Sequence, residues 1–263
     1  MNESERPSET MEERRGGPSA ETAISIETEE LEDLPRRERE RLMRRRLMLD
    51  AALSVFAEKG YADATLDEIA QRAEFGKGTL YNYFEGGKEE ILIAVFDDVY
   101  AALHQLIERT FSPALVRGHP FRDVLEGFLT ALLSFFNERQ DQFMIMLKEG
   151  YRLMFNDEPE KAAYLLEKSE GVIRALVPAI AEAQRSGELR DIPPHTIAHM
   201  VMGNVRGYHM HQCMAQCRHT FAEGEPEGAS EHVGEPEQTP SPAESARFLT
   251  TFLLNGLHSD TAD

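Results

Sequence analysis

Apolar residues recur at intervals of three and four along most of this chain. Met48, Ala52, Val55 and Phe56, for example, fall on one face of a helix, because 3.6 residues complete a helical turn. Runs of alternating Val, Ile and Thr joined by a tight hairpin turn, which indicate strands, do not occur. The pattern therefore predicts an all-α protein.

Breaks in the apolar spacing divide the first part of the chain into short helices. Gly60 follows the first apolar stripe, and we expect it to end that helix as a left-handed cap. Thr65 precedes the next stripe and has Glu68 three residues later, a spacing that predicts a capping box at a helix N-terminus. A turn at 74–76 separates this helix from a third one over about 77–84.

The stripes that follow predict a series of longer helices. One begins near Lys88, and the break at 186–194, SGELRDIPP, separates two others. The remaining helices are expected at about 120–138, 141–156, 158–186, 194–218 and 243–257.

The negative charge of the chain is concentrated in segments that carry few large apolar residues. The sequence has 263 residues and a net charge of −19. Residues 1–35 hold eleven acidic residues and three arginines, and residues 222–242 hold six glutamates and no lysine or arginine. Segments of this kind bury too little apolar surface to offset the entropy lost on ordering. We expect a disordered acidic tail at 1–35 and a disordered acidic loop at 222–242.

A strongly basic run, RRERERLMRRR, lies just ahead of the first apolar stripe. Its residues, 36–46, include seven arginines and two glutamates. We expect this run to lie along DNA phosphates or in a minor groove, with Arg44 and Arg45 as the candidate contacts. The alternative is a solvated start of the helix, in which Glu40 and Arg44 pair with each other four residues apart.

The second and third short helices have the order and spacing of a helix-turn-helix unit, which would lie within a domain spanning 36–88. Such a unit places its second helix in the major groove of DNA, and the run FGKGTLYNYF, residues 75–84, fits that role. Gly76 and Gly78 let the helix N-terminus approach a phosphate closely, and its free N–H groups favour an anion.

Several side chains of this run are donors suited to a nucleic acid. Lys77 and Thr79 lie at its N-terminal end, and Tyr81 and Tyr83 carry hydroxyl groups on stiff arms. Asn82 is a candidate reader of adenine, which asparagine recognises through two hydrogen bonds. The alternatives are a solvated asparagine, tyrosines that are ordinary amphipathic surface residues, and glycines that serve only the turn.

Residues 48–92 resemble the DNA-binding domain of the TetR/AcrR family of transcriptional repressors. The similarity rests on AA, F and KGY in the first helix, T-x-x-x-IA-x-x-A in the second, and KGTLYNYF followed by a lysine. Glu74 and Gly76 depart from it, since the family usually has glycine at the first position and often serine at the second. The resemblance implies contacts with DNA at Thr65, Lys77, Gly78, Thr79, Tyr81, Tyr83 and Lys88.

The resemblance also implies what the rest of the chain does. Residues 89–258 would form a helical bundle that binds a small hydrophobic effector and needs no cofactor. Helices at about 194–218 and 243–257 would pair with those of a second copy to make a homodimer. Because a homodimer presents two recognition helices, its operator would be a near-palindrome in double-stranded DNA. Binding of the effector would release this repressor from DNA.

An apolar, aromatic and Met-rich set of residues is the candidate lining of the effector pocket, since ligand pockets are mostly apolar. The alternative for each residue is a place in the ordinary core. The set comprises Phe128, Leu132, Phe135, Phe143, Met146, Met154, Phe155 and Tyr164.

A His- and Cys-rich stretch, 195–219, carries a second candidate chemistry. His209, Cys213 and Cys217 are spaced four residues apart and share one helical face, and such nitrogen and sulfur ligands suit zinc or copper. The function would then be a regulator that senses a metal or the thiol redox state. The alternative is a core or dimer helix in which cysteine serves as a small apolar residue.

Enzyme classes are disfavoured because their signals are missing. No histidine follows a glutamate by three residues, as di-iron helical bundles require, and neither a Walker loop nor a nucleophile elbow occurs. Two cysteines permit one disulfide at most, and no secretory signal or membrane-length apolar stretch is present. We therefore expect a cytoplasmic regulator with no membrane partner, and not an enzyme.

Overall fold

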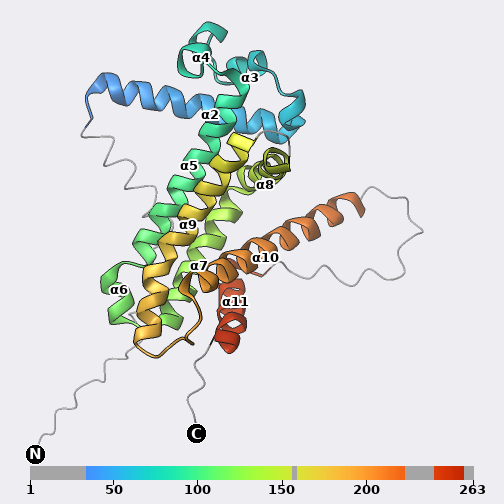
Figure 1. Ribbon diagram of the computed structural model, residues 1–263. Helices are drawn as coiled ribbons and strands as arrows, with labels where there is room; N and C mark the ends of the chain where they lie inside the picture. Colours follow the sequence, from blue (N-terminus) through green and yellow to red (C-terminus); the bar gives the residue numbers. More distant parts are fainter. Residues whose placement is uncertain (1–33, 156–158, 223–239, 258–263) are drawn as a thin grey trace, which may run out of the picture. The chain divides into compact units, whose positions relative to one another are not determined.

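The computed structural model of the protein describes residues 34–155, 159–222 and 240–257, and for 216–222 and 256–257 it describes the backbone alone. Every regular element in these ranges is a helix, which confirms the all-α prediction (Figure 1). Most expected helices lie within a few residues of their predicted bounds. The helices are α2 (Arg36–Asp63), α3 (Leu66–Arg72), α4 (Lys77–Tyr83), α5 (Gly87–Thr110), α6 (Pro113–Gly118), α7 (Phe121–Glu138), α8 (Gln140–Phe155), α9 (Pro159–Arg185), α10 (Pro194–Ala222) and α11 (Pro242–Leu257).

The structure adds one helix, α6, and the two acidic segments lie largely outside the described residues. The sequence did not predict α6, a six-residue helix that begins at Pro113, where the fixed φ of proline suits a first helical position. The acidic tail expected at 1–35 and the loop expected at 222–242 lie largely outside the described residues. At the edge of that loop, Ser241 accepts the Glu244 N–H at 3.3 Å and donates its hydroxyl to the Glu244 carboxylate at 2.7 Å, which caps the start of α11.

The basic run is helical over its whole length, as part of α2. Its charges pair with acids one turn away: Arg36 Nε lies 2.8 Å from the Glu40 carboxylate, and Arg46 Nε lies 3.1 Å from that of Asp50. Glu40 therefore pairs with Arg36 and not with Arg44, the partner that the sequence suggested. The run is a helix start, and its contact with DNA stays a prediction.

Gly60 introduces a kink near the end of α2. Its φ of 81° is positive, as predicted, but its ψ of 159° is far from the left-handed helical value. The expected left-handed cap is therefore wrong in form. Glycine is nevertheless the residue that suits this position, because its combination of φ and ψ is open almost solely to glycine. The chain resumes helical geometry after the kink and reaches Asp63.

Two apolar cores hold the helices together. The first contains the buried faces of α2, α3 and α4 and the first half of α5, and it includes Met48, Ala52, Val55 and Phe56 as predicted. It also contains Ile145 and Leu153 from α8 and Leu165 from α9. The second core lies among α5, α7, α9, α10 and α11. Packing therefore crosses the domain boundary expected at residue 88.

The break between α9 and α10 is built as the sequence predicted. Gly187 has a φ of 82°, and its N–H donates to the Gln184 carbonyl at 3.0 Å, while Glu188 N–H donates to Ala183 at 2.9 Å. These two bonds form a helix-ending Schellman motif. The Glu188 carboxylate then accepts the Phe121 N–H at 2.6 Å, so this break also caps α7. Within the described ranges, no helix combines the length and apolar character needed to cross a bilayer.

Candidate DNA-binding surface and ligand cavity

The start of α3 is fixed by the predicted capping box. The Thr65 hydroxyl accepts the Glu68 N–H at 3.3 Å, and the Glu68 carboxylate accepts the Thr65 N–H at 3.1 Å. Lys59 also donates to this carboxylate. The Lys59 hydrogen bond, followed by those from Thr65, lowers the pKa of Glu68 to about 2. Thr65 is exposed but its hydroxyl is already engaged, so a contact with phosphate would have to be made in addition to the cap.

The turn between α3 and α4 is a second Schellman motif, with Glu74 in the position that glycine usually occupies. Phe75 N–H donates to the Ala70 carbonyl at 2.9 Å and Glu74 N–H donates to the Gln71 carbonyl at 3.1 Å. Glu74 has a φ of 59° and is the one residue other than glycine with a positive φ in the part of the chain that the structure describes. A left-handed conformation costs an L-residue roughly 1–2 kcal/mol. The departure seen at Glu74 in the sequence therefore places both strain and a negative charge in this turn.

The short helix α4 presents one face to the core and another to solvent. Leu80 and the following Phe84 are 1% and 2% exposed, whereas Tyr81 and Asn82 are exposed. Tyr83 is half-buried and packs against the core. The structure thus separates the two tyrosines that the sequence treated alike: Tyr81 is presented outward, and Tyr83 mainly seats the helix.

The N-terminal end of α4 is open. A Cβ added at Gly78 would meet no atom within 4 Å, and one at Gly76 would lie 4.0 Å from the Thr79 hydroxyl. Internal packing therefore does not require glycine at either position. Lys77 donates to the Asp67 carboxylate at 2.9 Å, and this hydrogen bond raises the pKa of Lys77. The lysine is held beside the helix N-terminus by an exposed acid that a phosphate could replace.

Lys88 has a structural role that the sequence did not reveal. Its ammonium donates to the carbonyls of Tyr61, Ala62 and Ala64 at 2.7, 2.9 and 2.9 Å. An ammonium group has three N–H donors, so these bonds use all of them. Lys88 caps the C-terminal end of α2 in this structure, and the predicted contact between Lys88 and a phosphate stays a prediction.

The two arginines expected to contact DNA differ in their surroundings. Arg45 is half-buried: its guanidinium lies 3.5 Å from the Asp98 carboxylate on α5 and 5.7 Å from the centre of the Phe84 ring. Arg44 is exposed. Arg44 is thus the better placed of the pair for an external partner, and Arg45 links α2 to α4 and α5.

A cavity of about 200 Å³ lies among α5, α7, α8, α9 and α10. Four of the eight predicted pocket residues line it: Phe135, Phe143, Met146 and Met154. The other four do not line this cavity. Phe128 and Leu132 are fully buried in the second core. Phe155 is 82% exposed at the end of α8. Tyr164 donates its hydroxyl to Asp97 on α5.

Polar groups at the cavity wall escaped the sequence analysis. They include Arg139, Gln142 and Arg206, along with Tyr100 and Ser169. The Arg139 guanidinium lies 4.5 Å from the centre of the Phe135 ring and 3.4 Å from the Glu138 carboxylate. Burial raises the pKa of Tyr100, and the charge of Arg206 acts in the opposite direction. The sequence did hold a sign that Arg139 borders the cavity, because this arginine directly follows the apolar stripe of α7.

His209 and Cys213, two of the three residues of the alternative metal site, lie close together on α10. His209 Nε2 lies 3.6 Å from Cys213 Sγ, both residues are buried, and the His209 ring packs on Phe136 and Phe143 with centres 5.3 and 4.6 Å apart. Burial lowers the pKa of His209, which favours a neutral ring. The side chain of Cys217 is outside the described residues, so sensing through this cluster stays a prediction. A different group, Glu170, His195 and His199, brings three atoms of ligand type within 4.8 Å of one another.

The outer faces of α10 and α11 carry exposed aromatic residues. Of the stripe seen in the sequence, Leu249 and Leu253 are buried in the second core, whereas Phe248 and Phe252 are 58% and 60% exposed. A shallow groove beside them includes Gly203 and Gly207 of α10. An apolar surface bordered by two glycines allows another helix to approach closely.

Comparison with known proteins agrees with this architecture. Residues 48–95 match the model of the family described as "Bacterial regulatory proteins, tetR family". The uncharacterized HTH-type transcriptional regulator YhgD of Bacillus subtilis is 25% identical over 159 residues, which cover 60% of this chain and 78% of YhgD. For YuxN, another uncharacterized HTH-type regulator of that organism, identity is 31% over 127 residues, which cover 47% of this chain and only 40% of YuxN.

The fold is also similar to that of a solved structure with a bound ligand. The transcriptional regulator FadR from Bacillus subtilis, in complex with stearoyl-CoA, superimposes with a TM-score of 0.61 at 19% identity, covering 81% of this chain and 98% of FadR. At this identity the similarity establishes the fold alone.

Proposed function

We propose that this chain, a DNA-binding helix-turn-helix transcriptional regulator of the TetR family, is a homodimeric repressor that a small amphipathic effector releases from a near-palindromic operator. The observation that carries the proposal is the exposed face of α4. Its glycines leave an open N-terminus, and Tyr81 and Asn82 lie beside it with no role in the core.

The chemistry of α4 suits both phosphates and base edges. Free N–H groups at a helix N-terminus bind anions, and Gly78 has no side chain to hold a phosphate away. Lys77 can exchange its bond with the exposed Asp67 for one with a phosphate, and Tyr81 adds a hydroxyl donor. Asn82 is the exposed amide that could read an adenine. These groups supply both the positioning contacts and the base contact that specific recognition needs.

A dimer is supported by the surface of α10 and α11. Phe248 and Phe252 expose a large apolar area, and such areas on a protein surface commonly mark an interface. The same faces on a second copy would bury these rings against Gly203 and Gly207. Two copies related by a two-fold axis would present two α4 helices to half-sites one turn of DNA apart, or a multiple of that distance.

The cavity supports an effector with an apolar body and an anionic end. Its wall combines phenylalanine and methionine side chains with two arginines, Arg139 and Arg206. The similarly folded FadR was solved with stearoyl-CoA, a ligand of that character. A volume of about 200 Å³ is below the roughly 300–1,000 Å³ of most ligand pockets. A long acyl chain would therefore have to widen the cavity.

Widening of the cavity by the effector would be transmitted to the DNA-binding helices through residues of α5 and α8. Phe96 of α5 lines the cavity and also belongs to the core around α3 and α4. α8 provides a second link, because Met146 lines the cavity, Ile145 and Leu153 lie in that same core, and Arg152 lies 5.0 Å from the centre of the Tyr61 ring. An effector that favours the widened state would shift α4. It acts only if it binds that state better than the DNA-bound one.

The first test is DNA binding by fluorescence anisotropy, with the DNA upstream of the protein's own gene against a scrambled duplex. A preference of ~10³-fold or more is expected at about 0.15 M salt. Tyr81→Phe should weaken binding to both duplexes alike, whereas Asn82→Ala should change the preference between operator variants. Equal, weak binding to both duplexes, and to a genomic library of fragments, would refute the proposed operator role.

The second test asks for release. An acyl-CoA, the matching free fatty acid and the matching fatty alcohol are added to the protein–DNA complex. The two anionic ligands should dissociate it and the alcohol should do so poorly. Arg139→Met should remove that distinction, and Arg117→Met, an exposed arginine on α6, should leave it intact. A reporter gene behind the operator then separates repression from activation by the sign of the change on deletion of the regulator.

A further inference from the structure

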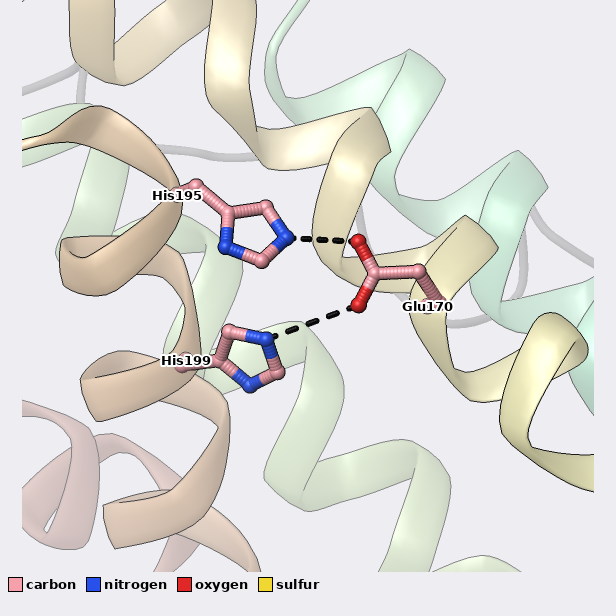
Figure 2. A group of neighbouring side chains, drawn as sticks. All are labelled: Glu170, His195 and His199. Atoms are coloured by element: carbon pink, nitrogen blue, oxygen red, sulfur yellow. Dashed lines mark hydrogen bonds and ion pairs between the residues drawn. The ribbon is translucent and has the colours of Figure 1, made fainter.

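Two histidines of α10 and one glutamate of α9 converge at the protein surface. Figure 2 shows both imidazole rings pointing toward the Glu170 carboxylate. His195 Nε2 lies 2.5 Å from one carboxylate oxygen of Glu170, and His199 Nε2 lies 3.5 Å from the other. The two rings are 4.6 Å apart between centres. We propose that Glu170, His195 and His199 form a binding site for a divalent transition-metal ion of the zinc type.

The spacing of the two histidines on α10 is what brings their rings together. Residues four apart lie one above the other on a helix face, and two histidines so placed present their nitrogens to one ion. The three ligand atoms all lie within 4.8 Å of one another. Zinc bonds to nitrogen and oxygen are about 2.0–2.2 Å long. Small rotations of the side chains therefore suffice for all three atoms to reach one ion, which would replace the contact between His195 and Glu170.

The types of ligand decide which ions fit. Two imidazole nitrogens with one carboxylate oxygen suit Zn²⁺, Ni²⁺ and Cu²⁺, whereas Mg²⁺ and Ca²⁺ prefer oxygen ligands throughout. The side chains of His195 and His199 are 49% and 53% exposed. An ion here would be reached directly from solvent and would keep an open position for water.

The dipole of α10 and the charge of Arg174 both disfavour a cation at this site, and the Glu170 carboxylate offsets them. His195 is in the first turn of α10, where the helix dipole disfavours positive charge. Arg174, one turn after Glu170 on α9, acts electrostatically on that carboxylate. The Glu170 carboxylate supplies the negative charge among the three ligands, since a ligating imidazole is neutral. Glu170 is therefore the ligand on which the site depends most.

The position of this group gives the ion a structural effect. His195 and His199 continue along α10 to Met202 and Arg206, at spacings of three and four, and these two residues line the cavity. Glu170 directly follows Ser169, another lining residue. A bound ion would link α9 to α10 next to the residues of these two helices that line the cavity. The ion site itself does not depend on the proposed effector.

The test is calorimetric titration of ZnCl₂ into the full-length protein after removal of metal with a chelator. One ion per chain is expected. Glu170→Gln, which keeps a hydrogen-bonding partner for His195, should weaken binding by more than the roughly 10–100-fold typical of residues outside the ligand set. His195→Ala and His199→Ala should do the same. His119→Ala, an exposed histidine beside α6, is the matched control and should bind as the unmodified chain does.

A second variant separates this site from the His and Cys residues farther along α10. The double substitution Cys213→Ala with Cys217→Ala should leave the stoichiometry and affinity unchanged. Loss of zinc binding in that variant, with retention in Glu170→Gln, would overturn the proposal, as would the absence of any heat of binding. Cobalt(II) provides an independent readout, because its visible spectrum reports coordination by nitrogen and changes on loss of His195 or His199. Circular dichroism of each variant establishes that loss of metal is not loss of fold.

Discussion

Replacing Glu74 by glycine should make the protein more stable and should also strengthen its binding to DNA. Glu74 has a φ of 59° in the turn between α3 and α4. This conformation costs an L-residue roughly 1–2 kcal/mol. Glycine removes that cost but gives the unfolded chain more freedom, which takes back about 0.4–1 kcal/mol. The net gain in the free energy of unfolding should be about 0.5–1 kcal/mol.

The control for this substitution is Glu74→Ala, which removes the charge and keeps the side-chain Cβ that causes the strain. Both variants lose one exposed negative charge in the turn next to α4, and both should bind operator DNA a few-fold more tightly at low salt. Only Glu74→Gly should gain stability. The two variants together therefore separate the backbone effect from the charge effect.

The assay is urea unfolding followed by circular dichroism at one fixed protein concentration, since the stability of the proposed dimer would rise with concentration. The midpoint should rise for Glu74→Gly with an unchanged slope. The melting temperature should rise by about 1–4 °C. If Glu74→Gly is no more stable than Glu74→Ala, the positive φ at position 74 is not strained, and the reasoning fails.

Three further substitutions test other features of the structure. Lys88→Ala should lower the free energy of unfolding by roughly 1–3 kcal/mol, because three carbonyls lose a charged donor; an unchanged urea midpoint would show that water replaces it. Glu68→Gln should lose stability at neutral pH, because hydrogen bonds from Lys59 and Thr65 lower the pKa of Glu68 from 4.5 to about 2. That contribution is complete above the unfolded-state pKa and is lost as the pH falls toward the folded-state pKa. Thermal melts across this range should therefore show the difference from the unmodified chain shrinking in acid, and a constant difference would contradict the assignment. Phe252→Glu should convert the proposed dimer into a monomer in light scattering, whereas Phe155→Glu, at another highly exposed phenylalanine, should not.

Much of the fold could be predicted from the sequence, because local signals decide it. The box formed by Thr65 and Glu68 and the apolar face of the first helix depend on neighbours within one or two turns. The positive φ of Gly60 was also local, but its ψ was not, because the chain after the kink has to meet Lys88 from α5. Local pattern thus fixed the elements and left their exact ends to distant contacts.

The surroundings of the candidate site residues were predicted for some and not for others, because contacts with helices distant in the sequence decide them. Tyr81 and Tyr83 look equivalent in the sequence, but their positions on a short helix put one in solvent and the other against the core. Phe128 and Phe135 share one stripe of α7, yet only Phe135 faces the cavity, because the order of the packed helices decides which part of a stripe meets a void. The order in which the helices pack cannot be read from the apolar pattern of one helix alone.

The core shared by α2, α3, α4, α5 and α8 has a practical consequence for anyone who would build hybrid regulators from this chain. A hybrid that joins the residues up to 88 to a foreign bundle would remove Val95, Phe96, Ile145 and Leu153 from the core around α3 and α4. Tyr61 would also lose Arg152, which faces its ring from α8. A working exchange of operator specificity should therefore transplant only the solvent face of α4, grafting new residues at positions such as Tyr81 and Asn82 and leaving the supporting helices with their own bundle.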